Sequence, residues 1–257
     1  MAFRILVAAL FVFLLAPVLL VVPISFSADN HLSWPPSGWS LRWYATLGHQ
    51  AGLTQALRVT VVLALIVTGL SLLLGLMAAL ALTRASFRGR EVVATLLSAP
   101  LLLPTIVLGL AVLMVFVSRG LIGSWPGLAM AHLLVTLPYA LRMLTTALTT
   151  LPPSLEEAAA SLGAPPLQVL IRVTLPLMAP AIVAAAAIVF LISFDEVVVS
   201  LFVVGPRLTT LPVALYHYIE SHTDPLVAAV SVLMICVTLT FVVILDRTVG
   251  LRRAVGS

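Results

Sequence analysis

Two pairs of acidic residues carry most of the chemistry that this sequence offers. Glu156 and Glu157 lie in a polar segment, residues 152–176, and Asp195 and Glu196 lie within a later apolar run. A carboxylate outside a membrane can bind an arginine of a partner protein. A carboxylate within an apolar segment normally faces a cavity or a partner, because burying it there costs on the order of 2.5–3.5 kcal/mol. The first pair therefore indicates a contact with a partner protein, and the second indicates either attraction of a cation or a contact with a partner.

Several other chemistries are excluded or disfavoured. All thirteen basic residues are arginine, and a P-loop requires a lysine beside its glycines, so the chain has no ATP and Mg²⁺ site of that type. No serine occupies a Gly-x-Ser-x-Gly turn, and the five histidines show no i, i+4 ligand spacing, so we predict neither an enzyme nor a metal site. The arginines are scattered between apolar runs, which does not favour nucleic acid as a partner.

The composition indicates an integral membrane protein. Of the 257 residues, 62% are hydrophobic and 9% are charged, compared with about half and about a quarter in soluble domains. Six stretches have roughly the 20 apolar residues that cross a bilayer. We predict an all-α membrane protein of six transmembrane helices, forming a single transmembrane domain over residues 1–257. The stretches are Phe3–Phe26, Leu57–Leu82, Val92–Val117, Gly127–Leu148, Met178–Val204 and Leu226–Leu245.

The distribution of arginines predicts the orientation. With six spans both termini lie on one side, and if that side is the cytoplasm, nine arginines are inside and four are outside, as the positive-inside rule favours. The polar segment 152–176, between spans four and five, is then cytoplasmic. Segments 27–55 and 205–225 are then outside. The nine inner arginines are Arg4, Arg84, Arg88, Arg90, Arg142, Arg172, Arg247, Arg252 and Arg253.

The polar segment predicts a short helix, a turn and a second helix outside the membrane. Ser154 followed by Glu157 fits a capping box, so a helix is expected to begin near Leu155. Gly163 is expected to end it in a left-handed conformation. A proline pair, residues 165–166, suits the first turn of a second helix, which we expect to end at Pro176.

The spacing of Glu157-Ala158-Ala159, Gly163 and Leu175-Pro176 resembles the EAA loop of ABC importer permeases. The family pattern is Glu-Ala-Ala, three residues, Gly, nine residues, then Ile-x-Leu-Pro. Val173 stands where isoleucine is usual and keeps the apolar, β-branched character. In addition, the run Ser193–Gly205 resembles the second permease of spermidine/putrescine importers, which have a paired acidic motif there. That resemblance points to a polyamine as the substrate.

The resemblance implies that the EAA segment is a coupling helix seated in a cleft of a cytoplasmic ATPase dimer, which binds ATP and Mg²⁺. Glu157, with Glu156 beside it, would bind a basic group there, Ala158 and Ala159 would pack in the cleft, and Gly163 would make the turn. An alternative for Glu157 is that it only caps its own helix. The family also implies a second, homologous permease, an extracytoplasmic substrate-binding protein, and a place in the bacterial inner membrane.

The substrate pathway has open alternatives. Asp195 and Glu196 either attract a cation along the pathway, or form an ion pair with the companion permease or lie at a helix end near water. Neighbouring helical residues point about 100° apart, so at most one is expected to face the pathway. Tyr216 either contacts a cation through its ring face or occupies an interfacial aromatic position.

A different class of protein also fits part of the sequence. In an ATP-independent channel or secondary carrier, Asp195 and Glu196 would couple to ions, and segment 152–176 would be a connector. Such carriers usually show internal repeats with broken spans in both halves. The two halves of this chain, residues 1–125 and 126–257, show no convincing self-similarity, which favours the importer.

Overall fold

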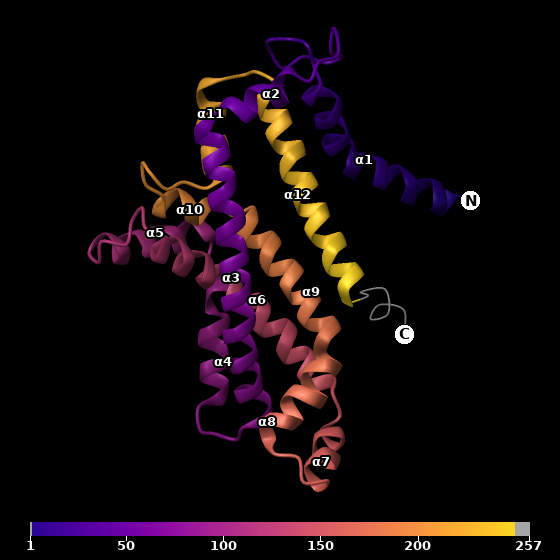
Figure 1. Cartoon of the computed structure of the whole chain (residues 1–257), viewed down its shortest axis with the longest axis vertical. Coiled ribbons are helices and arrows are strands. Elements are labelled where there is room, and N and C mark those ends of the chain that lie inside the picture. The colour runs from indigo at the N-terminus through magenta and orange to yellow at the C-terminus, as the bar shows by residue number, and fades with distance from the viewer. Residues whose placement is uncertain (1, 250–257) are drawn as a thin grey trace. The chain divides into compact units, whose positions relative to one another are not determined.

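The structure is a computed structural model that describes residues 2–249, and it consists there of helices and connecting loops. The contacts divide the chain into two compact units. The first comprises the chain up to Arg58 together with Leu211–Thr240, and the second comprises Val59–Thr210 and the chain from Phe241. Helices α3 (Ala51–Arg84) and α12 (Leu226–Val249), which are labelled in Figure 1, contribute residues to both.

The predicted all-α membrane architecture is confirmed. Within the described residues, five helices are long and apolar enough to cross a membrane, and a bent helix pair makes six if it counts as one span. Of the arginines counted for the orientation, Arg252 and Arg253 lie outside the described residues. The five single spans are Phe3–Ser25 in α1 (Ala2–Ser25), Ala51–Arg84, α6 (Trp125–Thr150), Pro166–Phe194 and Leu226–Leu245.

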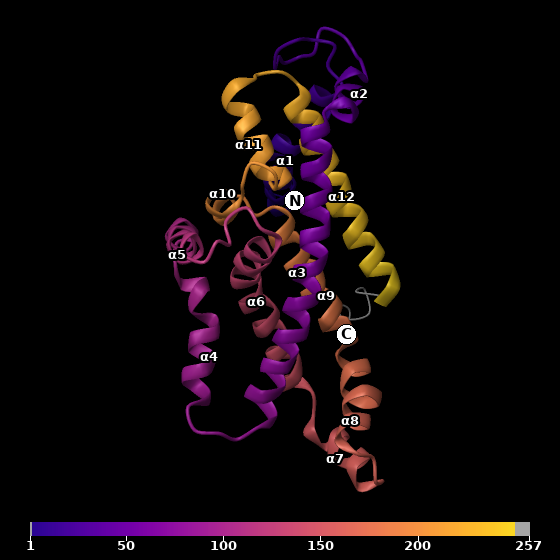
Figure 2. The ribbon, with the colours of Figure 1, turned by 60° about the vertical axis from the view of Figure 1, so that its left-hand side comes forward.

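The third span, expected as one helix, is bent. Helix α4 (Arg90–Ser98) continues into a 3₁₀ turn (Ala99–Leu102), and α5 (Thr105–Val117) then departs at 107°, as Figure 2 shows. Pro104 causes the break, because it lacks an N–H for the helix and holds the residue before it extended. The ψ of Leu103 is accordingly 138°.

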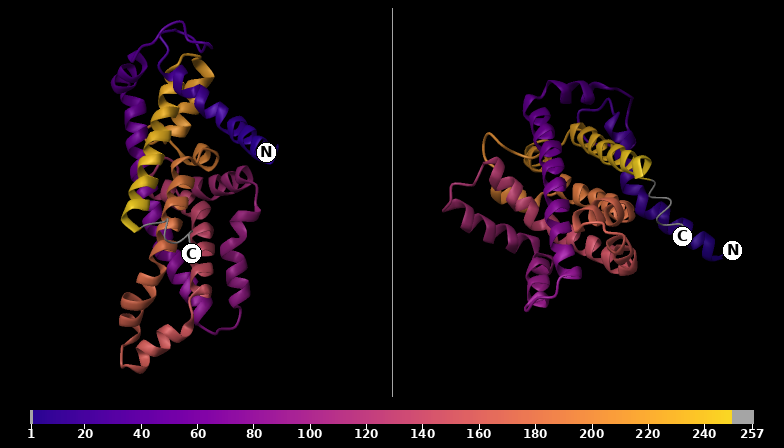
Figure 3. Two further views of the ribbon diagram at one scale, coloured as in Figure 1. Left: turned by 90° about the vertical axis from the view of Figure 1, so that its right-hand side faces the viewer. Right: turned by 60° about the horizontal axis from the view of Figure 1, so that its bottom comes forward.

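Two apolar clusters form the core of the second unit. One joins α3, α5, α6 and the short helix α10 (Val198–Val203). The other joins α3 and α6 to α9 (Leu175–Phe194), which runs beside α6 (Figure 3). These helices are the frame for every polar site described below except those of the first unit.

The fifth span differs from the expectation at both ends. The second helix of the polar segment does not end at Pro176 but continues into the membrane, since α8 (Pro166–Val169), a π-helical turn (Leu170–Thr174) and α9 follow without a break. Pro176 is tolerated because it lies in the first turn of α9, directly after the π turn that already alters the regular bonding pattern. At the other end, α9 stops at Phe194 rather than running through Val204.

The first unit contains the remaining short helices. Helix α2 (Arg42–His49), the start of α3, α11 (Leu211–Ser221) and the start of α12 surround one apolar cluster, which includes Leu47, Leu53 and Leu226. The loop between α1 and α2 folds back on itself, and Ser27 and Trp39 form an isolated antiparallel β-bridge.

Asp29 organises that loop. Its carboxylate accepts hydrogen bonds from the hydroxyls of Ser27 (2.9 Å), Ser33 (2.6 Å) and Ser37, and from the backbone N–H of Ser37 (3.0 Å). These bonds stabilise the charged form and hold the pKa of Asp29 well below its ordinary value. Arg42 donates from its guanidinium to the Asp29 carbonyl, so the loop is also fixed to α2.

This arrangement predicts an acid-resistant loop. A lowered pKa means that the stabilisation by Asp29 is fully present above the ordinary carboxyl pKa of 3.8 and is lost only as the pH falls through the lower, folded-state value. In a W43F/W125F background, the fluorescence of exposed Trp34 and Trp39 should therefore stay constant from pH 7 to about pH 4. Asp29→Asn should change the emission at pH 7. Matching spectra for the two proteins would contradict this role.

Candidate functional site: the α7 segment and the α9–α10 break

Helix α7 (Pro153–Ser161) begins earlier than expected, and the predicted capping box is wrong. Pro152 is the N-cap residue, and no side chain caps the helix. Proline at the first position fixes a helical φ without losing a needed N–H, so the helix already includes Ser154, which cannot be its N-cap. The structure therefore does not support the alternative in which Glu157 caps its own helix.

The predicted turn at Gly163 is confirmed. Its φ is +87°, in the left-handed region that favours glycine. The N–H of Gly163 donates to Ala160 (2.9 Å) and that of Ala164 donates to Ala159 (3.2 Å), which satisfies the last carbonyls of α7. The chain then reverses and enters α8 at Pro166, as the proline pair predicted.

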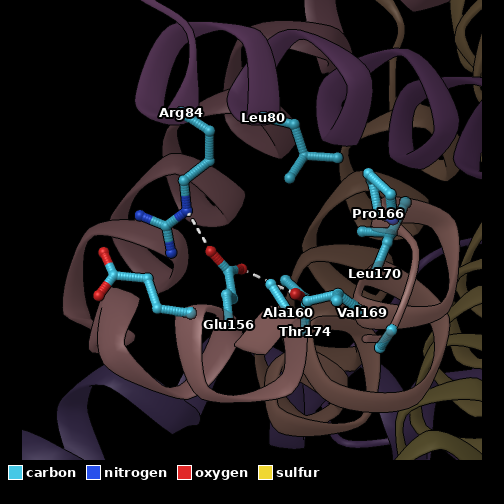
Figure 4. Close-up of a pocket in the computed structure, with 10 residues that line it drawn as sticks. Leu80, Arg84, Glu156, Ala160, Pro166, Val169, Leu170 and Thr174 are labelled. Atoms are coloured by element: carbon cyan, nitrogen blue, oxygen red, sulfur yellow. Dashed lines mark hydrogen bonds and ion pairs between the residues drawn. The ribbon is translucent and has the colours of Figure 1, made fainter. Parts of the chain in front are cut away.

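Glu156 fastens α7 to two other helices. One carboxylate oxygen lies 2.8 Å from Nε of Arg84 at the end of α3, and the other accepts a 2.7 Å hydrogen bond from the buried hydroxyl of Thr174. Figure 4 shows Glu156 between these two partners. Since Thr174 immediately precedes α9, a single side chain connects α7 to the ends of two membrane spans.

A cavity of about 480 Å³ lies beside this contact. Glu157 shares its wall with Glu156 and Arg84, whereas most of the remaining wall is apolar (Figure 4). Its other lining residues are Leu80, Ala160, Ala164, Pro166, Val169, Leu170 and Thr174.

The rest of α7 is open to a partner. None of its residues is buried, and Glu157 has no ion pair with any described residue. Ala158 is exposed, Ala159 is half-buried, and Leu162 beside the turn is 90% exposed. The motif residues Leu175 and Pro176 lie on α9 and do not line the cavity.

The acidic pair lies where a membrane helix breaks. Asp195 is the C-cap residue of α9 and is exposed, with no hydrogen-bond or ion-pair partner for its carboxylate among the described residues. Glu196 is half-buried and accepts a 2.8 Å hydrogen bond from the N–H of Val199 at the start of α10. The two carboxylates thus differ. Glu196 already accepts a hydrogen bond from the backbone, whereas Asp195 accepts none from the described residues and could bind a ligand.

A buried histidine holds this break in place. His132 on α6 is fully buried, and its Nδ1 and Nε2 lie 2.9 and 2.8 Å from the hydroxyls of Ser193 and Ser200. The Ser200 hydroxyl donates to the carbonyl of Glu196, so Nε2 of His132 donates to Ser200. The imidazole therefore connects α6 to both sides of the acidic pair.

Other predicted residues are placed separately. Tyr216 lies on α11 in the first unit, 46% exposed, with its ring edge against His217. No group of three or more histidine, cysteine, aspartate or glutamate side chains that could hold a metal ion occurs among the described residues.

Three contributors were missed in the sequence: Arg84, Thr174 and His132. The arginine count places Arg84 among the inner arginines, but its contact with Glu156 joins residues 72 positions apart, which no local pattern reveals. His132 has a usable signal, because an ionisable residue within an apolar span is a functional candidate by default.

Similarity to solved structures defines the class of fold. The crystal structure of a bacterial ABC transporter involved in the import of alginate contains a chain with a TM-score of 0.71, 16% sequence identity, and coverage of 96% of this chain and 94% of that one. This chain therefore shares the fold of a membrane chain of that ABC transporter.

Sequence comparison places the chain more closely. Residues 71–251 match the family described as binding-protein-dependent transport system inner membrane component, and the chain belongs to this family. It is similar to the putrescine transport system permease PotI of Escherichia coli K12, with 33% identity over 88% of this chain and 82% of that protein. It is also similar to the spermidine/putrescine permease PotC of Haemophilus influenzae, with 34% identity over 91% of both. The chain is a multi-pass inner-membrane protein of a class of non-catalytic subunits.

The contacts of His132 predict a large effect of its removal. His132→Ala should lower the free energy of unfolding by about 2–4 kcal/mol, because it leaves a cavity and two serine hydroxyls without their partner. His49→Ala, at an exposed position, should change it by less than about 0.5 kcal/mol. Thermal unfolding in lipid nanodiscs measures both, and equal stability of the two variants would refute the cross-link.

Proposed function

We propose that the chain is the permease subunit of an ATP-driven, binding-protein-dependent importer of polyamines, forming half of the translocation pathway. The observation that carries the proposal is the 33–34% identity, over most of the chain, to permeases of putrescine and spermidine/putrescine transport systems. The acidic pair at the α9–α10 break supports a cationic substrate. The other half of the pathway would come from a second, homologous permease.

The α7 segment is the proposed contact with a cytoplasmic ATPase dimer. Its exposed helix, the unpaired carboxylate of Glu157 and the protruding side chain of Leu162 suit a cleft that offers a basic group and apolar surface. This role requires segment 152–176 and both termini to be cytoplasmic, as the arginine distribution predicts. ATP and Mg²⁺ would be bound by the ATPase, and an extracytoplasmic binding protein would deliver the substrate.

The contact of Glu156 explains how motion would reach the membrane. A displacement of α7 would pull directly on Arg84 at the end of α3 and on Thr174 at the start of α9. Glu156 would therefore transmit force within the chain, and Glu157 would bind the ATPase. The two neighbouring glutamates have separable tasks under this proposal.

That separation can be tested by neutralising each glutamate in turn. Glu157→Gln should weaken co-purification with the ATPase roughly tenfold, the effect of losing a charge-assisted hydrogen bond of about 1.4 kcal/mol. Glu156→Gln should leave association intact and lower substrate-stimulated ATP hydrolysis. Ser161→Ala, at an exposed position on the same helix, is the control. Full association and full stimulation in Glu157→Gln would refute the coupling role.

The cation pathway is tested with the assembled importer in proteoliposomes. Asp195→Asn should raise the KM for putrescine roughly tenfold, equivalent to about 1.4 kcal/mol, because Asp195 is the available carboxylate. Glu196→Gln should have a smaller effect on KM, since Glu196 already binds the backbone of α10. Glu220→Gln on the exposed part of α11 is the control.

Unchanged uptake in both pathway variants would remove the acidic pair from the pathway. Uptake by this chain alone, without ATP and without its partners, would overturn the importer proposal in favour of a channel or secondary carrier. The two outcomes are independent, since the first concerns the substrate and the second the energy source.

A further inference from the structure

A second cavity in the Val59–Thr210 unit has no part in the proposed coupling or pathway. It encloses about 360 Å³ between the end of α3, one face of α4 and the C-terminal half of α6. The end of α3 and the start of α4 lie towards the same end of this unit as α7 (Figure 2). The lining residues are Leu82, Arg90, Glu91, Ala94, Ser98, Leu141, Arg142, Thr145 and Thr146.

The cavity has an excess of unused hydrogen-bond donors. Neither Arg90 nor Arg142 has a carboxylate within ion-pair distance among the described residues. The hydroxyl oxygen of Thr145 is buried and has no hydrogen-bond partner, which is costly unless a ligand supplies one. Glu91 also lines the wall, so the side chains together carry a charge of +1 if both arginines and Glu91 are ionised.

These donors match a phosphate group. Arginine is the side chain best suited to phosphate, because its planar guanidinium can donate two parallel hydrogen bonds to two phosphate oxygens. A hydroxyl such as that of Thr145 can donate a third. A sugar or an amine would leave the positive charge uncompensated.

The surroundings of the cavity indicate where the phosphate comes from. Val93 on α4 is 39% exposed and lies three residues after Arg90, on the same side of the helix. The donors therefore lie beside apolar helix surface, and Arg90 follows directly on the polar loop that joins α3 to α4. A group with a charged head and apolar chains fits both surfaces, as in the basic pockets between transmembrane helices that bind anionic lipids.

From this geometry we infer that the Arg90–Arg142 cavity is a binding site for the phosphate headgroup of an anionic phospholipid. The acyl chains lie along the exposed apolar surface of α4. The lipid bridges α4 and α6 and supplies the acceptor that the Thr145 hydroxyl lacks. Glu91 disfavours headgroups that carry further negative charge close to the phosphate.

The test uses the whole importer complex in nanodiscs of phosphatidylethanolamine and phosphatidylglycerol. Lipid retained after extraction into detergent is measured by mass spectrometry. The wild type should retain phosphatidylglycerol in excess of its share in the nanodisc. Each arginine is expected to contribute about fivefold, so R90Q/R142Q should lower the enrichment by roughly 25-fold. R88Q/R119Q removes two exposed arginines outside the cavity and should stay within about twofold of the wild type.

Two further arms distinguish the other occupants. In nanodiscs of phosphatidylethanolamine alone, inorganic phosphate at constant ionic strength should not raise the Tm of the wild type; a rise that R90Q/R142Q abolishes would assign the cavity to free phosphate and overturn the lipid site. A different outcome is loss of the companion permease from the R90Q/R142Q complex, with lipid retention unchanged. It would show that the two arginines bind a carboxylate of that subunit rather than a lipid.

Thr145→Val is the variant to measure if R90Q/R142Q does not assemble. It preserves side-chain volume and both arginines, and removes only the hydroxyl without a partner. A two- to fivefold loss of phosphatidylglycerol enrichment in an assembled complex is expected. Wild-type enrichment in Thr145→Val together with wild-type enrichment in Arg142→Gln overturns the site.

Discussion

The two-sided contact of Glu156 is the interaction on which the α7 segment depends. Helix α7 buries none of its own residues, and a helix of nine residues is too short to be stable by itself in water. Its position must therefore come from contacts with the rest of the second unit. Glu156 supplies them through an ion pair to Arg84 and a hydrogen bond to Thr174, so removing this side chain would release the helix from two spans at once.

That contact also explains why the π turn before α9 matters. Thr174 is the last residue of the turn and is buried, and the wider π geometry is a common feature of functional sites. The segment can thereby run from Pro166 into the membrane without a break while it presents the Thr174 hydroxyl to Glu156. A regular helix interrupted at Pro176 would have separated the polar segment from the span that it is proposed to move.

The sequence predicted the parts of the structure that local rules govern. Gly163 and the proline at position 166 fixed the turn and the next helix start, because their backbone restrictions act wherever they occur. Apolar length gave the spans. The capping box failed because a proline one position earlier in the chain began the helix first, and the bend at Pro104 was missed because hydropathy does not register it. The partners of Glu156 and His132 lie far away in sequence, on helices whose packing no local pattern specifies.

In the second unit, polar side chains that have partners within the chain hold the helices together. Polar side chains that have none are the ones proposed to bind other molecules. Glu156, Glu196 and His132 find partners within the chain and thereby fix the ends of helices, and for Glu196 and His132 a missing partner would be costly because they lie in membrane spans. Among the described residues, Glu157, Asp195 and the Arg90–Arg142 pair have no such partner. Each of these side chains lies beside a side chain that has its partners, or beside exposed apolar surface. The packed helices there keep it facing outward. The proposed ligands of these three sites, a basic group of the ATPase, a cation and an anionic lipid, carry the opposite charges.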